Sequence, residues 1–180
     1  MDPNVLIGCA NESEINAPNN PPEAESEVCL LPEAFTVCSC FQDRDAAGAA
    51  ALHLAARFGC AEVIRWLLSV GGGAEVETNC GAVPAHYAAA NGDLACLQLL
   101  VQQAPGCVDR QTFTGATPLY LACQQGHLHV AEHLVNDCGA DVHLRAHDGM
   151  TCLHAAAHMG HHAVVVWLVS RGAARTFPTT

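Results

Sequence analysis

The chain contains no lysine, and arginine supplies all seven of its basic side chains. Aspartate and glutamate together number 18, so the formal net charge of the 180 residues is −11 at pH 7. Nucleic acids and anionic membranes are bound through basic patches, which this composition does not provide. We therefore expect neither a nucleic acid nor a membrane as partner, and the charge favours a partner segment that is itself basic.

Long apolar runs and aromatic side chains are also scarce. The apolar run at residues 163–169 is far shorter than the roughly 20 residues that span a bilayer. Aromatic residues make up 5% of the chain although hydrophobic residues make up 51%, so alanine and leucine dominate the apolar set. Small side chains of this kind suit short helices that stack closely.

Motifs of the common enzyme classes are absent as well. The sequence has no glycine-rich phosphate loop and no G-x-S-x-G turn. We therefore predict no enzymatic activity, no catalytic residue and no bound cofactor.

The eleven cysteines do not indicate a disulfide framework. Their number is odd, and the first residues, Met-Asp-Pro-Asn, lack the basic region of a secretory leader. We therefore expect reduced, mostly buried thiols in a cytoplasmic protein. Five of them fall at helix or helix-end positions of separate repeats: Cys60, Cys96, Cys123, Cys138 and Cys152.

Residues 1–42 differ in composition from the rest of the chain. They contain seven acidic residues, no basic residue and the run NAPNNPP. Prolines break helices and central strands, and a segment with little periodic apolar content cannot offset the entropy lost on ordering. We predict an acidic, disordered tail, in which the apolar residues 28–35 could pack on the first repeat.

A periodic pattern begins after this tail. Equivalent glycines recur at intervals of 33, 34 and 34 residues: Gly48, Gly81, Gly115 and Gly149. The third unit predicts an inner helix at 118–125, a break at Gly126 and an outer helix at 128–136. One helix pair and one turn in each unit of about 33 residues is typical of ankyrin repeats. We predict an all-α solenoid at residues 43–174 with short hairpin loops and a stub at 175–180, its repeats being 45–77, 78–110, 111–144 and 145–174.

Local signals mark the ends of the inner helices. Glycines follow each of them, where a left-handed residue is expected: Gly59, Gly92, Gly126 and Gly160. Thr117 and Thr151 predict side-chain caps in repeats three and four. Ala50 and Val83 replace this threonine in repeats one and two, which should each lose about 1 kcal/mol of capping. Repeats three and four are therefore expected to be the stiffest.

Two further sets of residues are assigned to the packing of the repeats. The histidine of the ankyrin Thr-Pro-Leu-His motif ties neighbouring loops together, so we expect structural roles for His53, His86 and His154. Apolar residues at helical spacing in the outer helices are expected to pack on the neighbouring repeat. They are Val63, Trp66, Leu67, Leu97, Leu100, Val101, Val130, Leu134, Val164, Trp167 and Leu168.

The segments LHLAARFG, PAHYAAANGDLACLQLLV and, above all, ATPLYLACQQGHLHVAEHLVNDCGADVHLRAHDGMTCLHAAAHMGH resemble the espin family, its espin-like members more than espin itself. The similarity covers about residues 45–170. It implies an ankyrin array that binds the tails of class III myosins in the parallel actin bundles of stereocilia and microvilli. Residues 1–42 do not share the resemblance, and no actin-bundling segment is present, so we expect only an indirect link to actin.

The binding surface of such an array is its concave face, built from the inner helix ends and the hairpin tips. Candidates at the inner helices are Arg57, Phe58, Tyr87, Asn91, Gln124, Gln125, His158 and Met159. Candidates at the tips are Thr78, Asn79, Thr112, Phe113, His147 and Asp148. Phe58, Tyr87, Phe113 and Met159 are expected to be the main anchors, because exposed apolar side chains have little other purpose.

Other functions stay open beside this one. The chain could be a generic ankyrin adaptor or scaffold, or a truncated product without an independent role. The outer helix at 163–169 is apolar on all sides, which predicts self-association through Val165, Val166 and Val169 unless something covers them.

A metal site is the remaining alternative. His129 and His133 have the i, i+4 spacing of a zinc-chelating pair, but no glutamate follows His129 as in an H-E-x-x-H motif, and a third ligand would have to come from another repeat. We therefore expect no metal and favour solvated helix faces for the histidines of this region. They are His127, His129, His133, His143, His147, His158, His161 and His162.

Overall fold

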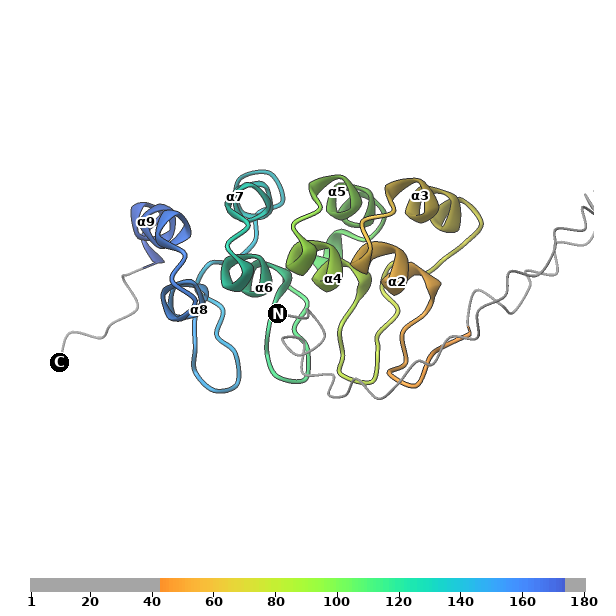
Figure 1. Cartoon of the computed structure of the whole chain (residues 1–180), viewed down its shortest axis with the longest axis horizontal. Coiled ribbons are helices and arrows are strands. Elements are labelled where there is room, and N and C mark those ends of the chain that lie inside the picture. The colour runs from red at the N-terminus through yellow and green to blue at the C-terminus, as the bar shows by residue number, and fades with distance from the viewer. Residues whose placement is uncertain (1–42, 174–180) are drawn as a thin grey trace, which may run out of the picture.

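The computed structural model describes residues 43–173 as a row of four helix pairs, drawn in Figure 1. The inner layer consists of α2 (Ala51–Arg57), α4 (Pro84–Asn91), α6 (Pro118–Gln125) and α8 (Cys152–His158). The outer layer consists of α3 (Ala61–Ser69), α5 (Leu94–Gln103), α7 (Leu128–Asn136) and α9 (His162–Ser170). A short 3-10 helix, η2 (Pro105–Cys107), follows α5.

Hairpin loops connect the pairs and project from the inner layer (Figure 1). No β-strand occurs within residues 43–173, where the extended loops contribute a single isolated bridge between Arg145 and Thr151. The all-α solenoid is therefore confirmed, and α6 and α7 have the predicted bounds. The acidic tail, the apolar stretch at 28–35 and the C-terminal stub fall outside the described residues.

The inner helices begin and end as their local signals predict. The hydroxyl of Thr117 accepts the backbone N–H of Tyr120 at 3.1 Å, whereas Val83 gives α4 no side-chain cap. Gly92 closes α4 with φ at 78°, a left-handed conformation that a residue with a Cβ adopts at a cost. The predicted difference in capping between the first two repeats and the last two is confirmed.

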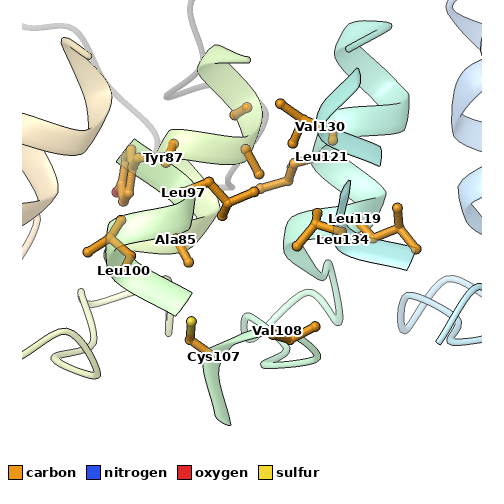
Figure 2. Packing of buried hydrophobic residues seen from close by; sticks show 14 of the residues in the cluster. Ala85, Tyr87, Leu97, Leu100, Cys107, Val108, Leu119, Leu121, Val130 and Leu134 are labelled. Carbon is orange, nitrogen blue, oxygen red and sulfur yellow. The ribbon is translucent and has the colours of Figure 1, made fainter. Parts of the chain in front are cut away.

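Leucines fill the space between the helix pairs. Figure 2 shows Leu97 of α5 and Leu121 of α6 between the second and third pairs, and both are fully buried. All residues of α4 except Asn91 are buried as well. The outer helices bury one stripe each, but Val63 and Trp66 of α3 are 47% and 56% exposed. The expectation that these two pack on the next repeat is wrong, because α3 turns Ile64 and Leu67 inward instead.

A buried histidine joins repeats two and three. Nδ1 of His86 accepts the backbone N–H of Val83 at 3.1 Å, so Nε2 carries the proton and donates to the carbonyl of Ala116 at 3.2 Å. Burial lowers the pKa of His86 to about 4. Nδ1 of His53 likewise accepts the N–H of Ala50 at 3.0 Å, but its Nε2 bonds the carbonyl of Val76, in the loop that follows α3 of its own repeat, at 2.9 Å. The structural roles predicted for His53 and His86 are confirmed.

The expected free thiols are present at Cys60, Cys96, Cys123, Cys138 and Cys152, and also at Cys107. Cys80 is disulfide-bonded, so the expectation of reduced cysteines is wrong at that position.

Candidate partner-binding surface

The C-terminal ends of the inner helices carry one row of candidate residues. Phe58, Asn91, Gln125 and Met159 occupy equivalent positions at or just after the last residue of their helices. Phe58 is 70% exposed, and the guanidinium carbon of Arg57 lies 5.6 Å from its ring centroid. Met159 is half-buried and Asn91 is exposed. The aromatic member of this row, Phe58, therefore presents most of its ring to solvent.

The hairpin tips carry a second row, formed by Asn79, Phe113 and His147, all exposed. The backbone N–H of each donates to a carbonyl of the preceding hairpin at 2.9 Å. The Phe113 ring also lies against Gly81, since a Cβ added there would meet Cδ1 at 2.7 Å. Even so, Phe113 remains 67% exposed. Its backbone is fixed by the hairpin stack while most of its ring stays available.

The two rows lie at opposite ends of the inner helices. The hairpins precede the helix N-termini, whereas the first row follows their C-termini. An inner helix of eight residues spans about 12 Å, at about 1.5 Å per residue. Phe58 and Phe113 are moreover two repeats apart, so they do not form one pocket. A single partner that contacts both residues must reach across the inner layer.

Tyr87 was expected to be an exposed anchor, and that expectation is wrong. It is only 4% exposed, and its ring meets His53 edge-on, with centroids 5.8 Å apart. Tyr87 lies one helical turn before Asn91, on the face of α4 that packs against α2, and not in the solvent-exposed row.

Thr78 and Thr112 are also buried, contrary to their selection as exposed tip residues. The Thr78 hydroxyl accepts the N–H of Ala82 at 3.2 Å, and the Thr112 hydroxyl accepts that of Ala116 at 3.1 Å. These hydroxyls close their hairpins and are not available to a partner. Asp148 is exposed, and its carboxylate accepts the N–H of Met150 at 2.9 Å.

Gln124 and Gln125 are half-buried at the end of α6, and His158 is exposed at the end of α8. Oε1 of Gln124 is the one buried side-chain oxygen or nitrogen in the described part of the chain that has no hydrogen-bond partner. Buried acceptors are normally paired. Rotation of this flexible side chain toward solvent would let the oxygen accept a donor from a bound segment.

Three histidines have a structural role that the sequence did not reveal. Nε2 of His127 bonds the carbonyl of Ala90 at 3.1 Å, and Nε2 of His161 bonds that of Gln124 at 3.0 Å. Both carbonyls lie 37 residues back, at the end of the preceding inner helix. His129 likewise bonds the carbonyl of Gly92 at 2.9 Å. These side chains were expected to be solvated, but they join neighbouring repeats.

The sequence did contain a signal for these contacts, because histidine recurs at the equivalent positions 127 and 161 of neighbouring repeats. Each ring lies over the glycine that ends the preceding inner helix, so that a Cβ on Gly92 would meet Nδ1 of His127 at 2.6 Å. No group of three or more metal-ligating side chains that could hold an ion occurs between residues 43 and 173.

The charge of the described region is acidic, with eleven aspartates and glutamates against six arginines. Glu77, just before the second hairpin tip, pairs with Arg110, just before the third, and this pairing raises the pKa of the Arg110 guanidinium. In the described part of the molecule, no helix has the length and hydropathy required to cross a membrane.

A family model described as ankyrin repeats (3 copies) matches residues 52–146 and 85–176, which together make up more than half of the chain. No curated protein matches the chain.

Proposed function

Because the chain belongs to the ankyrin-repeat family, whose members are protein-interaction modules, we propose that it binds a basic, partly helical segment of another protein across its inner layer. The observation that carries the proposal is the exposure of Phe58 and Phe113, 70% and 67%, the highest among the large apolar side chains of the described region. Apolar side chains this exposed are candidates for binding anchors. The acidic balance of the array favours a partner rich in lysine and arginine.

We name the tail of a class III myosin as the first partner to test. The support is the resemblance of residues 45–170 to the espin family, together with the charge. Such a partner would place the protein in the cytoplasm of actin-rich projections, stereocilia or microvilli, as a scaffold linked to actin filament bundles only through the myosin. A generic adaptor role with another basic segment is the second candidate.

The binding test uses fluorescence anisotropy with a labelled class III myosin tail peptide. Phe58→Ala and Phe113→Ala should each weaken binding by about tenfold or more, corresponding to about 1.4 kcal/mol. Val63→Ala, on the exposed side of α3, is the matched control and should leave the affinity unchanged. Equal affinity of both phenylalanine variants and the parent chain would remove these residues from the site.

A second peptide of the same length, with its basic residues changed to glutamate, tests the charge argument. It should bind more weakly at low salt, and the difference should shrink as ionic strength rises. In a low-speed co-sedimentation assay the chain alone should not bundle actin filaments. Bundling by the chain alone would contradict the indirect link to actin.

We also propose self-association as a property of α9. Val166 and Val169 are 54% and 49% exposed on this helix, whereas Val165 is half-buried and packs on the core. Light scattering at about 100 micromolar should therefore show a dimer or larger species, which Val166→Glu with Val169→Glu converts to a monomer. A monomeric parent chain at this concentration would contradict this proposal and leave the peptide-binding proposal intact.

A further inference from the structure

The outer face of the array has a groove of about 450 Å³, away from both rows of candidate binding residues. Repeat two contributes one wall, from α5, η2 and the residues that follow them. Repeat three contributes His133, at the last turn of α7, with Asp137 and Cys138 just after it. The groove therefore places three titratable groups opposite a wall with three apolar residues, Val101, Pro105 and Val108. Two glutamines, Gln98 and Gln102, complete that wall.

The three titratable groups are connected in series. Nδ1 of His133 lies 2.6 Å from Oδ2 of Asp137, and Nε2 lies 3.6 Å from Sγ of Cys138. A carboxylate only accepts hydrogen bonds, so Nδ1 carries the proton of the neutral ring and donates it to Asp137. Nε2 is then the nitrogen that accepts the S–H of Cys138. A nucleophile bonded to a base, with a third group orienting that base, is the arrangement that activates thiols.

The local backbone holds this arrangement in place. The carbonyl oxygen of His133 accepts the N–H groups of both Asp137 and Cys138, at 3.0 and 3.2 Å. The side chain of Cys138 is half-buried and packs against the core. Side chain and backbone of His133 thus both contact the same two residues, so the order of the three groups is fixed within repeat three.

Cys138 differs from the other free thiols of the described region. Cys96, Cys107, Cys123 and Cys152 are buried. Cys60 is exposed, but its thiol points at the carbonyl of Phe58, 3.8 Å away, and not at a base. Burial raises the pKa of the Cys138 thiol, and the charge of Asp137 raises it further. The thiol therefore keeps its proton at neutral pH, and its reaction depends on transfer of that proton to His133.

We propose that Cys138 is a covalent modification site for small electrophiles that combine an α,β-unsaturated carbonyl with an apolar chain. In the addition, Nε2 of His133 takes the thiol proton as Sγ forms a bond to the β-carbon of the electrophile. The electron pair of the carbon–carbon double bond moves to give the enolate, which then receives that proton at its α-carbon. No oxidant is consumed and no group leaves.

The remaining residues of the groove have positioning roles in this addition. Asp137 keeps the imidazole in the tautomer that can accept the proton. Val101, Pro105 and Val108 form the wall against which an apolar chain packs. The side-chain amides of Gln98 and Gln102 lie in the same lining and can donate to the carbonyl oxygen.

The test measures labelling rates in the full chain with N-ethylmaleimide, followed by peptide mass spectrometry at Cys138 and Cys60. Although Cys60 is more exposed, Cys138 should react at least about tenfold faster, since general-base assistance typically accelerates proton transfer by about a hundredfold or more. His133→Gln should lower the labelling rate of Cys138 to that of Cys60 or below, without changing the rate of Cys60. Glu132→Gln, on the same helix, is the matched control and should change neither rate.

A second measurement on the parent chain tests the groove without any variant. N-cyclohexylmaleimide should show a larger ratio of Cys138 to Cys60 labelling than N-ethylmaleimide, because its ring packs on the valine and proline wall. Asp137→Asn should reduce the Cys138 rate less than His133→Gln does. Labelling of Cys138 no faster than Cys60, or a Cys138 rate unaffected by His133→Gln, would overturn the proposal.

Discussion

Helices α4 and α8 occupy equivalent places in repeats two and four, yet they are stabilised differently. Val83, the residue before α4, provides no side-chain cap, but all residues of α4 except Asn91 are buried. α8 is capped by Thr151, whose hydroxyl accepts the N–H of His154 at 3.5 Å. Three residues of this helix are nevertheless exposed: His154, Ala157 and His158. A cap contributes about 1 kcal/mol, whereas burying one large apolar side chain contributes about 1.5–3 kcal/mol. Position in the array therefore outweighs the local capping signal.

The same contrast holds for the histidine of each helix. His86 bonds Val83 and the next repeat through its two ring nitrogens, at 3.1 and 3.2 Å. His154 is exposed, and its Nδ1 lies 2.8 Å from the hydroxyl of Thr151 in its own repeat. The histidine of the Thr-Pro-Leu-His motif thus joins two repeats at position 86, whereas at position 154 it bonds only within its own repeat. The expectation that repeats three and four are the stiffest stays a prediction.

The largest difference in stability is expected between the alanine variants of His86 and His154. His86→Ala leaves the Val83 N–H buried without a partner and removes one of the two hydrogen bonds to the Ala116 carbonyl, which still accepts the N–H of Thr112. The free energy of unfolding should fall by about 2–3 kcal/mol. His154→Ala removes an exposed ring and should cost less than about 1 kcal/mol. Urea unfolding followed by circular dichroism measures both. Similar losses of unfolding free energy in the two variants would show that the burial of His86 does not make it more important for stability than His154.

The pH dependence of stability should follow the same histidine. The pKa of His86 falls from 6.5 to about 4 on folding because burial disfavours the charged ring. The unfolded chain then binds more protons below pH 6.5, so stability is complete above that pH and decreases as the pH falls toward 4. The loss should be on the order of 3 kcal/mol.

Urea unfolding at several values between pH 7 and pH 4 measures this slope. His86→Gln should flatten it, whereas His154→Gln, the control, should leave it unchanged. Burial also lowers the pKa of His53 and His127, which add to the slope in the same direction. An unchanged slope in His86→Gln would assign the pH dependence to other groups.

The glycines that follow α4 and α8, Gly92 and Gly160, allow a further comparison of the two repeats. Gly92 and Gly160 have nearly the same φ, 78° and 77°, so alanine meets the same backbone strain at both. A Cβ at Gly92 would meet the His127 ring at 2.6 Å, whereas one at Gly160 would meet no described atom within 4 Å. Gly92→Ala should therefore be about 1–2 kcal/mol more destabilising than Gly160→Ala. Equal urea midpoints for the two variants would mean that the His127 ring moves aside freely.

The smallest effect is expected at the caps. Thr117→Val removes the bond to the N–H of Tyr120 and should cost about 1 kcal/mol. Val83→Thr places a hydroxyl at the equivalent position of α4 and should stabilise the chain by a smaller amount, because that hydroxyl is also buried. Thermal unfolding of the two variants should shift in opposite directions. A loss of stability in both would show that α4 has no room for a side-chain cap.

Much of the fold could be predicted because its signals are local. The interval between equivalent glycines predicts the repeat, and the bounds of α6 and α7 follow from apolar periodicity and Gly126. Thr117 and Thr151 act on N–H groups three residues away, a distance that the sequence displays directly. The helix caps and helix ends depend on a few neighbouring residues, and the repeat period can be counted along the chain. The sequence by itself therefore determined these features.

The candidate binding surface was less predictable, because it depends on what the next repeat covers. Phe58 and Tyr87 are both aromatic residues near the end of an inner helix, but Phe58 follows its helix into solvent and Tyr87 faces His53 of repeat one. His127 bonds a carbonyl 37 residues back. Exposure and side-chain pairing arise from the stacking of whole repeats, and only the tertiary structure decided them.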